Sequence, residues 1–294
     1  MAFYGVHCRL PYDLSVTMKK ICAITMVRND EFFLRKWISY YGQQLGEENL
    51  YVYLDGKDQP VPQWKGKANV IPCERRQGTV AKSDKMRIDF LSDMAAELLK
   101  RYDMVIGIDV DEFLVVEPSQ NKSLREYLSE IKCAPSVSGL GVDVGQHMGL
   151  ETDIDPDKTF LSQRRFGVLS SRYTKTSVIS EPVRWGSGFH RVKGHNFRID
   201  PNLYLFHFGC IDLNMLRLRI NDKDRLDNGW SKHLAKRAKT ITVVSGHKAR
   251  EWEKSIPFMR RVESCCRQLF AWNKPSTCGF KWVVRIPERF ENVL

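Results

Sequence analysis

The sequence has no apolar run that approaches the roughly 20 residues needed for a membrane-spanning helix. Residues 1–20 contain no apolar segment followed by a small-residue cleavage site, so we expect no signal peptide. Internal repeats and low-complexity segments are missing as well. With 43% hydrophobic residues, a chain of 294 residues can bury a full core. We therefore expect a cytoplasmic protein with one main domain at residues 20–212, preceded by a short lead-in at residues 1–19.

Cysteines at metal-site spacing are also missing. The eight cysteines include no CxxC motif, and several lie in apolar strand-like runs, where a thiol behaves as a small hydrophobic group. This pattern argues against a zinc site or a disulfide framework and predicts buried, reduced thiols. The cysteines are Cys8, Cys22, Cys73, Cys133, Cys210, Cys265, Cys266 and Cys278.

Acidic residues are scarce near the end of the chain. Most of the net charge of +11 falls in residues 213–294, for which we expect a basic, mainly helical region, whereas residues 1–212 are close to neutral. A cationic segment with aromatics suits the surface of an anionic membrane, so we predict a peripheral contact with the inner face of the membrane. A merely solvated surface is the alternative, and no RNA- or DNA-binding signature favours nucleic acid as a partner. The tryptophans of this region are Trp230, Trp252, Trp272 and Trp282.

Apolar runs rich in β-formers alternate with helical patterns in the first part of the chain. Phe33, Trp37, Tyr40, Tyr41 and Leu45 recur at spacings of three and four, as on one face of a helix that Gly46 would end. Met86, Phe90, Met94 and Leu98 recur every four residues. This alternation predicts an α/β fold in which helices flank a mostly parallel sheet. The predicted strands are 20–27, 50–54, 68–72 and 104–114, and the helices are 33–45 and 83–98.

Further elements follow in the second part. Ser123 and Glu126 have capping-box spacing and predict a helix to about residue 131. Residues 151–158 are acidic and typical of a loop. Asp212 is a candidate cap for a helix at residues 213–220. Residues 139–144, 175–179 and 203–208 are predicted strands.

Three acids follow the apolar run at residues 104–108. Asp109, Asp111 and Glu112 come at the predicted end of a buried strand, and open α/β sheets bind ligands at that edge. An Asp-x-Asp pair alone occurs in many surface turns. Carboxylates held at a sheet edge nevertheless suit a hard divalent cation that neutralises a departing diphosphate. By itself, this placement predicts only that a polar ligand binds at this edge of the sheet.

Several motifs, in order, resemble the GT-A glycosyltransferases of families 2 and 92, whose usual pattern is an opening "KNE…L.EW..yH..lG" followed by "D.DEF". The matching stretches are residues 27–41, Gly46, residues 53–56 and residues 108–114. Asp30 stands where Glu is commoner, and Tyr40-Tyr41 where a His is frequent. The match is good for residues 21–116 and loose to about residue 212.

The resemblance implies a GT-A, Rossmann-like fold with a nucleotide-sugar half at about 20–117 and an acceptor half at about 118–212. It implies transfer of a sugar from a nucleotide-sugar, most plausibly a UDP-sugar, to a glycan hydroxyl, with inversion and with Mn²⁺ or Mg²⁺. Asp111 is then the direct metal ligand, and Asp109 contacts the ribose or sugar or reaches the metal through water.

The resemblance also places nucleotide contacts after the first strand, at Thr25, Arg28 and Asn29. Asp55 ends the second strand at a position suited to the base or ribose. Caps and turns are the alternative roles of these residues. Lys82, Lys85 and Arg87 start the next helix, where they either reach phosphate or form a solvated basic face.

Two histidines lie in suggestive contexts. His207 falls in an apolar strand-like run late in the domain, where many GT-A enzymes bring a third metal ligand; a buried core histidine is the alternative. His190 follows a Gly-containing loop with an aromatic and is either part of an acceptor or donor clamp or an ordinary turn residue. The sequence leaves the catalytic base open among Asp143, Glu151, Asp153, His190 and Asp212, and the family 2 pattern mildly favours Asp143.

We expect a lipid-linked or other glycan acceptor in surface polysaccharide biosynthesis, such as capsule or lipopolysaccharide. Two other classes remain open. A metal-dependent nucleotidyltransferase or phosphohydrolase would use the same acids, and a non-catalytic basic protein would bind nucleic acid or lipid headgroups.

Overall fold

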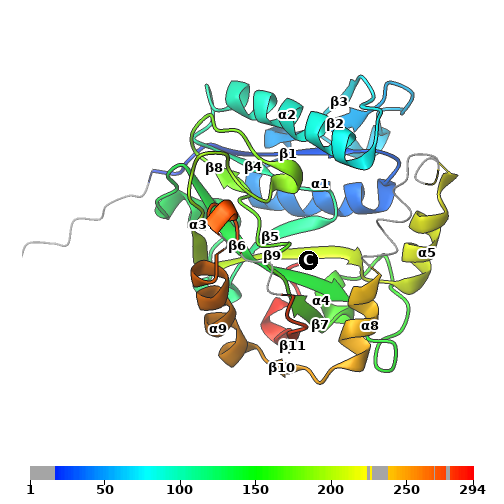
Figure 1. Ribbon diagram of the computed structural model, residues 1–294. Helices are drawn as coiled ribbons and strands as arrows, with labels where there is room; N and C mark the ends of the chain where they lie inside the picture. Colours follow the sequence, from blue (N-terminus) through cyan, green and yellow to red (C-terminus); the bar gives the residue numbers. More distant parts are fainter. Residues whose placement is uncertain (1–16, 224–225, 227–237, 268, 276–278) are drawn as a thin grey trace, which may run out of the picture.

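The computed structural model describes residues 17–294 apart from 224–225, 227–237, 268 and 276–278. Its described part contains one eleven-stranded sheet with helices on its faces (Figure 1). This confirms the predicted α/β class. The strands are β1 (Ile21–Val27), β2 (Leu50–Asp55), β3 (Asn69–Cys73), β4 (Met104–Gly107), β5 (Glu112–Val116), β6 (Ser136–Gly145), β7 (Phe166–Leu169), β8 (Val178–Ile179), β9 (Ile199–Cys210), β10 (Arg250–Glu251) and β11 (Val283–Arg285).

The helices number seven among the described residues, with several single 3-10 turns between them. The α-helices are α1 (Glu31–Leu45), α2 (Val80–Leu98), α3 (Leu124–Glu130), α4 (Phe160–Gln163), α5 (Leu213–Asn221), α8 (Lys239–Gly246) and α9 (Trp252–Cys265). Two of the 3-10 turns matter below, η4 (Ser187–Phe189) and η5 (Leu269–Ala271).

Parallel pairing is concentrated in the first half of the chain. β3, β2, β1 and β4 lie in that order and pair in parallel, so their carboxyl ends meet at one edge. β8 then pairs antiparallel with β4, and β6 pairs antiparallel with β7 and β8 but parallel with β9. The sheet is therefore parallel from β3 to β4 and mixed beyond these strands.

α1 and α2 cover opposite faces of the parallel strands (Figure 1). Alternate side chains of β1 point to opposite faces, so Ala23 packs in the core with Trp37 of α1, while Ile24 packs in the core with Leu91 of α2. The buried stripe of α2 is Ile88, Leu91, Ala95 and Leu98. Met86, Phe90 and Met94, from the four-residue pattern in the sequence, are only half-buried.

Three predicted helix ends are confirmed. Gly46 follows α1 with φ of 91°, a left-handed value that glycine adopts without a steric penalty. Ser123 and Glu126 form the capping box of α3. Asp212 caps α5, where its Oδ1 accepts a hydrogen bond from the Met215 backbone N–H.

The prediction of a single strand at residues 104–114 was wrong. β4 ends at Gly107, and β5 begins at Glu112 and pairs antiparallel with β9. The chain turns between them, where the Glu112 N–H donates to the Asp109 carbonyl at 3.1 Å. Apolar patterns do not reveal a change of pairing partner, because both segments are buried. Similarly, only the last two residues of the predicted strand 175–179 form β8.

The C-terminal region is mainly helical but contributes to the main core. β11 pairs with β7, and Trp252 is buried and stacked on Phe206 rather than available to a membrane surface. Trp272 is exposed, and Trp230 lies outside the described residues. None of the described helices has the length and apolar character to cross a membrane.

The prediction of buried thiols holds for part of the set. Cys22 and Cys210 are buried and Cys73 and Cys133 half-buried, and all four are free thiols. Cys265 and Cys266 are also free thiols but exposed, because they fall at the solvent-facing end of α9. Cys8 and Cys278 lie outside the described residues.

Gly141 of β6 lies directly against the segment that leads into β8. A Cβ atom there would overlap the backbone of Tyr173 and Thr174, and the Gly141 N–H donates to Thr174 Oγ1 at 2.8 Å. We expect Gly141→Ala to destabilise the fold by about 3 kcal/mol, since backbone atoms cannot yield as a flexible side chain can. Urea unfolding measures the change.

Gly246→Ala is the matched control, because no atom of the described residues lies within 4 Å of its added Cβ. Its effect should stay within about 1 kcal/mol. Equal effects of the two substitutions would contradict the close approach of β6 to residues 173–174.

Candidate functional site

A cavity of about 610 Å³ opens at the carboxyl edge of β1, β2 and β4. Its volume lies in the range that holds small-molecule ligands in proteins. The walls come from the segments after the parallel strands, the first turns of α2, the η4 turn and α5. The lining residues are Met26, Val27, Arg28, Asn29, Asp30, Asp55, Arg75, Arg76, Val80, Ala81, Ser83, Asp84, Arg87, Asp109, Val110, Asp111, Lys175, Ser187, Gly188, His190, Arg219 and Asp222.

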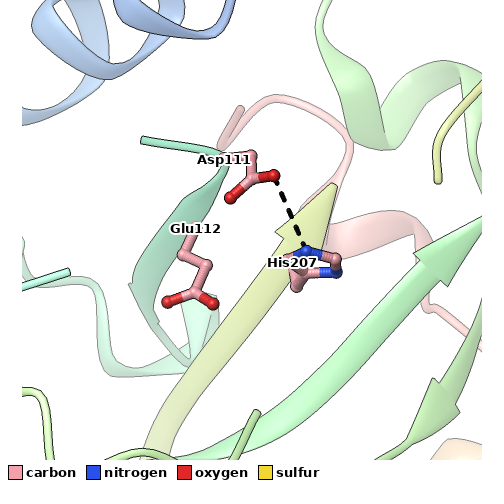
Figure 2. A group of neighbouring side chains, drawn as sticks. All are labelled: Asp111, Glu112 and His207. Carbon is pink, nitrogen blue, oxygen red and sulfur yellow. Dashed lines mark ion pairs between the residues drawn. The ribbon is translucent and has the colours of Figure 1, made fainter. Parts of the chain in front are cut away.

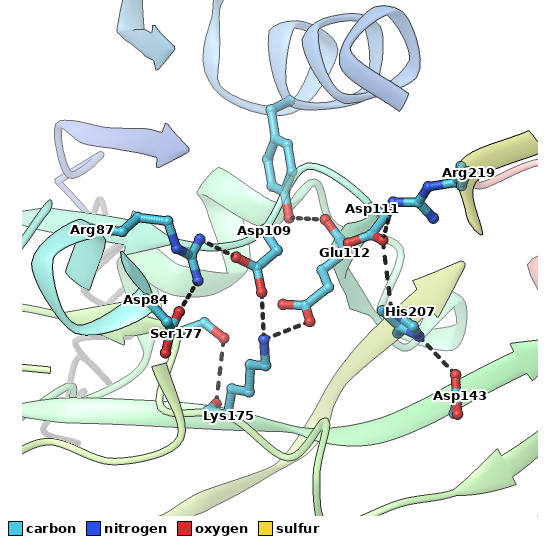
Figure 3. Close-up of polar contacts among 11 residues, drawn as sticks. Asp84, Arg87, Asp109, Asp111, Glu112, Asp143, Lys175, Ser177, His207 and Arg219 are labelled. Atoms are coloured by element: carbon cyan, nitrogen blue, oxygen red, sulfur yellow. Dashed lines mark hydrogen bonds and ion pairs between the residues drawn. The ribbon is translucent and has the colours of Figure 1, made fainter. Parts of the chain in front are cut away.

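Asp109 is held between two cations (Figure 3). Its Oδ1 accepts from Arg87 at 2.5 Å, and its Oδ2 accepts from Lys175 Nζ at 2.7 Å. Burial alone would raise the pKa of Asp109, but the charges of Arg87 and Lys175 hold it far below the usual range. Asp109 is therefore an ionised carboxylate with both oxygens engaged.

Lys175 also contacts Glu112, so one ammonium group serves two carboxylates. Lys175 Nζ lies 2.6 Å from Glu112 Oε1, and both side chains are almost fully buried. Within the described part of the chain, Glu112 Oε2 has no hydrogen-bond partner. Burial raises the pKa of Glu112 to about 7, although Lys175 opposes the shift. Lys175 thus serves one carboxylate whose pKa is lowered and one whose pKa burial raises.

Asp111 lies beside Arg219 and His207. Arg219 Nη2 lies 3.0 Å from Asp111 Oδ2 and 3.0 Å from Asp30 Oδ2, so it bridges α5 to the residue before α1. Burial would raise the pKa of Asp111, but His207 and Arg219 lower it to about 2. Asp30 occupies the N-cap position of α1 without capping it, because its side chain is directed to Arg219.

His207 presents one ring nitrogen to Asp111 (Figure 2). Its Nδ1 lies 2.7 Å from Asp143 Oδ1, and its ring stacks on Tyr173 at 3.9 Å between centroids. Asp143 Oδ2 in turn accepts from Thr240 Oγ1 at 2.6 Å. A proton on Nδ1, directed at Asp143, leaves Nε2 facing Asp111 Oδ2 at 3.7 Å.

The donor set fits a divalent cation. One ligand atom each from Asp111, Glu112 and His207 lies within 4.8 Å of the others. Metal-bound histidines usually donate their far nitrogen to a carboxylate or carbonyl, and Asp143 supplies that carboxylate here. Asp109 is the least suited of the predicted ligands, because both its oxygens already carry ion pairs.

The nucleotide-binding candidates fall into two groups. Arg28, Asn29 and Asp55 line the cavity: Arg28 donates to the Asp55 carbonyl at 2.8 Å, and Asp55 Oδ1 accepts from the Arg76 N–H at 3.0 Å. Thr25 is fully buried within β1, and Lys82 lies in the first turn of α2; neither is among the lining residues.

The candidate bases are also separated. His190 lines the cavity, whereas Asp143 lies behind His207. Glu151 accepts hydrogen bonds from the backbone N–H groups of His147 and Arg165, and Asp212 is a helix cap paired with Arg164. Asp153 accepts from Asn214 at the surface.

Sequence reasoning missed Lys175 and Arg219 as site residues. Lys175 starts a predicted strand and lies between two threonines, a context that gives no sign of its contacts with Asp109 and Glu112. Arg219 is one of many cations in the basic region, and its position in α5 gives no sign that it reaches Asp111. Arg75 and Arg76, which follow β3, were also missed.

No family model matches this chain, and none of the curated proteins does. Among solved structures, it is similar to mannose-1-phosphate geranyltransferase from Thermus thermophilus, with 10% identity over 77% of this chain and 67% of that one and a TM-score of 0.29. A likeness at this level says nothing about activity.

Lys175 pairs with the buried Glu112 and the half-buried Asp109, so we expect Lys175→Met to destabilise the protein by about 3 kcal/mol at neutral pH. In the variant the pKa values of Asp109 and Glu112 rise, and protonation relieves the cost. The deficit should therefore shrink as the pH falls toward the ordinary carboxyl range. Urea unfolding across this pH range measures it.

Lys254→Met serves as the control, because Lys254 is exposed and its one ion pair within the described ranges is with exposed Glu251. It should change stability by less than about 1 kcal/mol at every pH. A pH-independent effect of Lys175→Met would contradict the assigned charge cluster.

Proposed function

We propose that this protein is a glycosyltransferase that moves a sugar from a nucleotide-sugar, most plausibly a UDP-sugar, to a glycan hydroxyl with the help of Mn²⁺ or Mg²⁺. The observation that carries the proposal is the convergence of Asp111 and His207 Nε2 beside one cavity at the ends of three parallel strands. The ordered motifs that resemble families 2 and 92 supply the choice of reaction.

Charge balance in the cavity supports a bound cation. Six Lys or Arg side chains and six Asp side chains line it, so the walls alone offer no net charge to a diphosphate. Asp111, Glu112 and His207 would hold the ion, which would neutralise the leaving nucleotide diphosphate. Arg219 adds a fixed positive charge beside Asp111.

Asp109 acts differently from Asp111 in this proposal. Because Arg87 and Lys175 occupy its oxygens, Asp109 orients these two cations at the cavity wall. A contact of Asp109 with the donor ribose, or with the metal through water, remains our prediction. Arg28, Asn29 and Asp55 line the part of the cavity where β1 and β2 end, which suits the nucleoside.

His190 is the stronger candidate for the base that accepts the acceptor's proton. It lines the cavity, as a base within reach of a bound substrate must. Asp143 is a positioning residue in this scheme, since its Oδ1 holds His207 Nδ1 and its Oδ2 is taken by Thr240. Inversion, and a place in capsule or lipopolysaccharide synthesis, rest on the resemblance and stay predictions.

The decisive experiment is a panel of nucleotide-sugars tested with and without Mn²⁺ for nucleotide release. We expect at least one UDP-sugar to release UDP in a Mn²⁺-dependent way, and Asp111→Asn to reduce the rate by about a hundredfold or more, because the ion loses its charged ligand. Glu97→Gln is the control for the loss of a carboxylate, since Glu97 is exposed and, among the residues that the structure describes, pairs with Lys100 alone.

The products separate the alternatives. A nucleotidyltransferase or phosphohydrolase using the same acids would break a phosphoryl bond and yield a sugar phosphate. Release of sugar phosphate would reject the glycosyltransferase proposal. It would also be rejected if no donor were turned over and Asp111→Asn behaved like the wild type throughout.

We also expect Asp143→Asn to weaken Mn²⁺ binding about 10- to 100-fold without abolishing it, because an amide holds His207 less firmly in the required tautomer. Calorimetric titration of the variant with Mn²⁺ measures this. Thr240→Val, which removes only the hydroxyl on the other oxygen of Asp143, should have a smaller effect. Unchanged Mn²⁺ affinity in Asp143→Asn would show that His207 is not a ligand.

A further inference from the structure

A second cavity, of about 550 Å³, lies next to the first. Ser187 and His190 line both, so the η4 turn is the wall between them. Gly186 N–H donates to the Arg191 carbonyl at 2.8 Å, and Trp185 Nε1 donates to the Thr176 carbonyl at 2.8 Å. These bonds hold the segment that carries the η4 turn in place. Because His190 lines both cavities, the proposed base faces each of them.

The second cavity is cationic. Lys85, Arg191, Lys193 and Lys274 line it against the single carboxylate of Asp89, which lies 3.6 Å from Lys193 Nζ. Across the described part of the chain, no ion pair engages Lys85, Arg191 or Lys274. Three positive charges that the described residues leave unneutralised are suited to an anionic ligand.

An exposed apolar tip adjoins this cavity. Leu269 is 97% exposed, Phe270 83% and Trp272 47%, directly before Asn273 and Lys274 of the cavity wall. The tip is anchored at its base, because Asn273 Nδ2 donates to the Val192 carbonyl at 3.0 Å. Side chains of this size exposed together on a fixed turn are typical of a surface that contacts lipid or a partner.

We infer that the second cavity receives the phosphate of a lipid-anchored acceptor and that the tip formed by Leu269, Phe270 and Trp272 enters the lipid surface beside it. Cations next to exposed apolar and aromatic residues match the chemistry of an anionic lipid interface. An acceptor held there by its phosphate would present a hydroxyl toward His190 and the donor cavity. This assignment rests on the proposed glycosyltransferase function, which requires an acceptor site beside the donor.

Flotation of the full chain with phosphatidylcholine vesicles, with and without phosphatidic acid, tests the inference. We expect binding only when phosphatidic acid is present. Lys274→Ala and Lys85→Glu should each weaken it by about fivefold or more, because each removes a cation near the surface. Leu269→Ser/Phe270→Ser should weaken it by about tenfold. Lys100→Ala, an exposed lysine paired with Glu97, is the control and should bind like wild type.

The outcomes distinguish a lipid phosphate from a soluble phosphorylated ligand. They also distinguish failure of the lipid-phosphate site from failure of the proposed glycosyltransferase function. The lipid assignment would be overturned in favour of a soluble phosphorylated ligand by two results together. Glycerol 3-phosphate would abolish vesicle binding, and Leu269→Ser/Phe270→Ser would bind like the wild type. Equal binding of both vesicle types, or no loss in the lysine variants, would overturn the cavity's role. Vesicle binding without turnover of any nucleotide-sugar would leave the lipid-phosphate site standing and reject the transferase proposal instead.

Discussion

The site depends on the ion pairs that neutralise the carboxylates of the turn between β4 and β5. Asp109 and Asp111 are half-buried and Glu112 is buried, and unpaired carboxylates in such positions would be destabilising. Lys175, which precedes β8, contacts both Asp109 and Glu112. Lys175 therefore ties the segment before β8 to the turn between β4 and β5.

This arrangement assigns the three acids to different tasks. Both oxygens of Asp109 form ion pairs, with Arg87 and Lys175. Glu112 also contacts Lys175, and its pKa is raised to about 7. Asp111 faces Arg219 and a ring nitrogen of His207. Among the three, only Asp111 combines a pKa lowered to about 2 with a neighbouring histidine ring nitrogen, since Asp143 holds the far side of His207. The geometry thus singles out Asp111 as the centre of the proposed metal site.

Local rules predicted the elements better than the contacts between them. The 3.6-residue period and the caps located α1, α3 and α5, because those signals lie in adjacent residues. The break after Gly107 was missed, since the segments on both sides are buried and the change of partner to β9 leaves no local pattern. Likewise, Asp111 and His207 stood out in the sequence as an acid motif and a histidine in an apolar strand. Lys175 and Arg219 did not, because ion pairs between residues tens of positions apart leave no local pattern.

The central claim is that Asp111 and His207 bind a divalent cation at the nucleotide edge of the sheet. Electron spin echo envelope modulation of Mn²⁺ bound to the full chain tests it most directly, because it detects an imidazole nitrogen coordinated to the ion. The account predicts a nitrogen modulation in wild type that disappears in His207→Gln while Mn²⁺ remains bound, more weakly, through Asp111. A Mn²⁺ signal without nitrogen coupling in wild type, or one unchanged by His207→Gln, would contradict it.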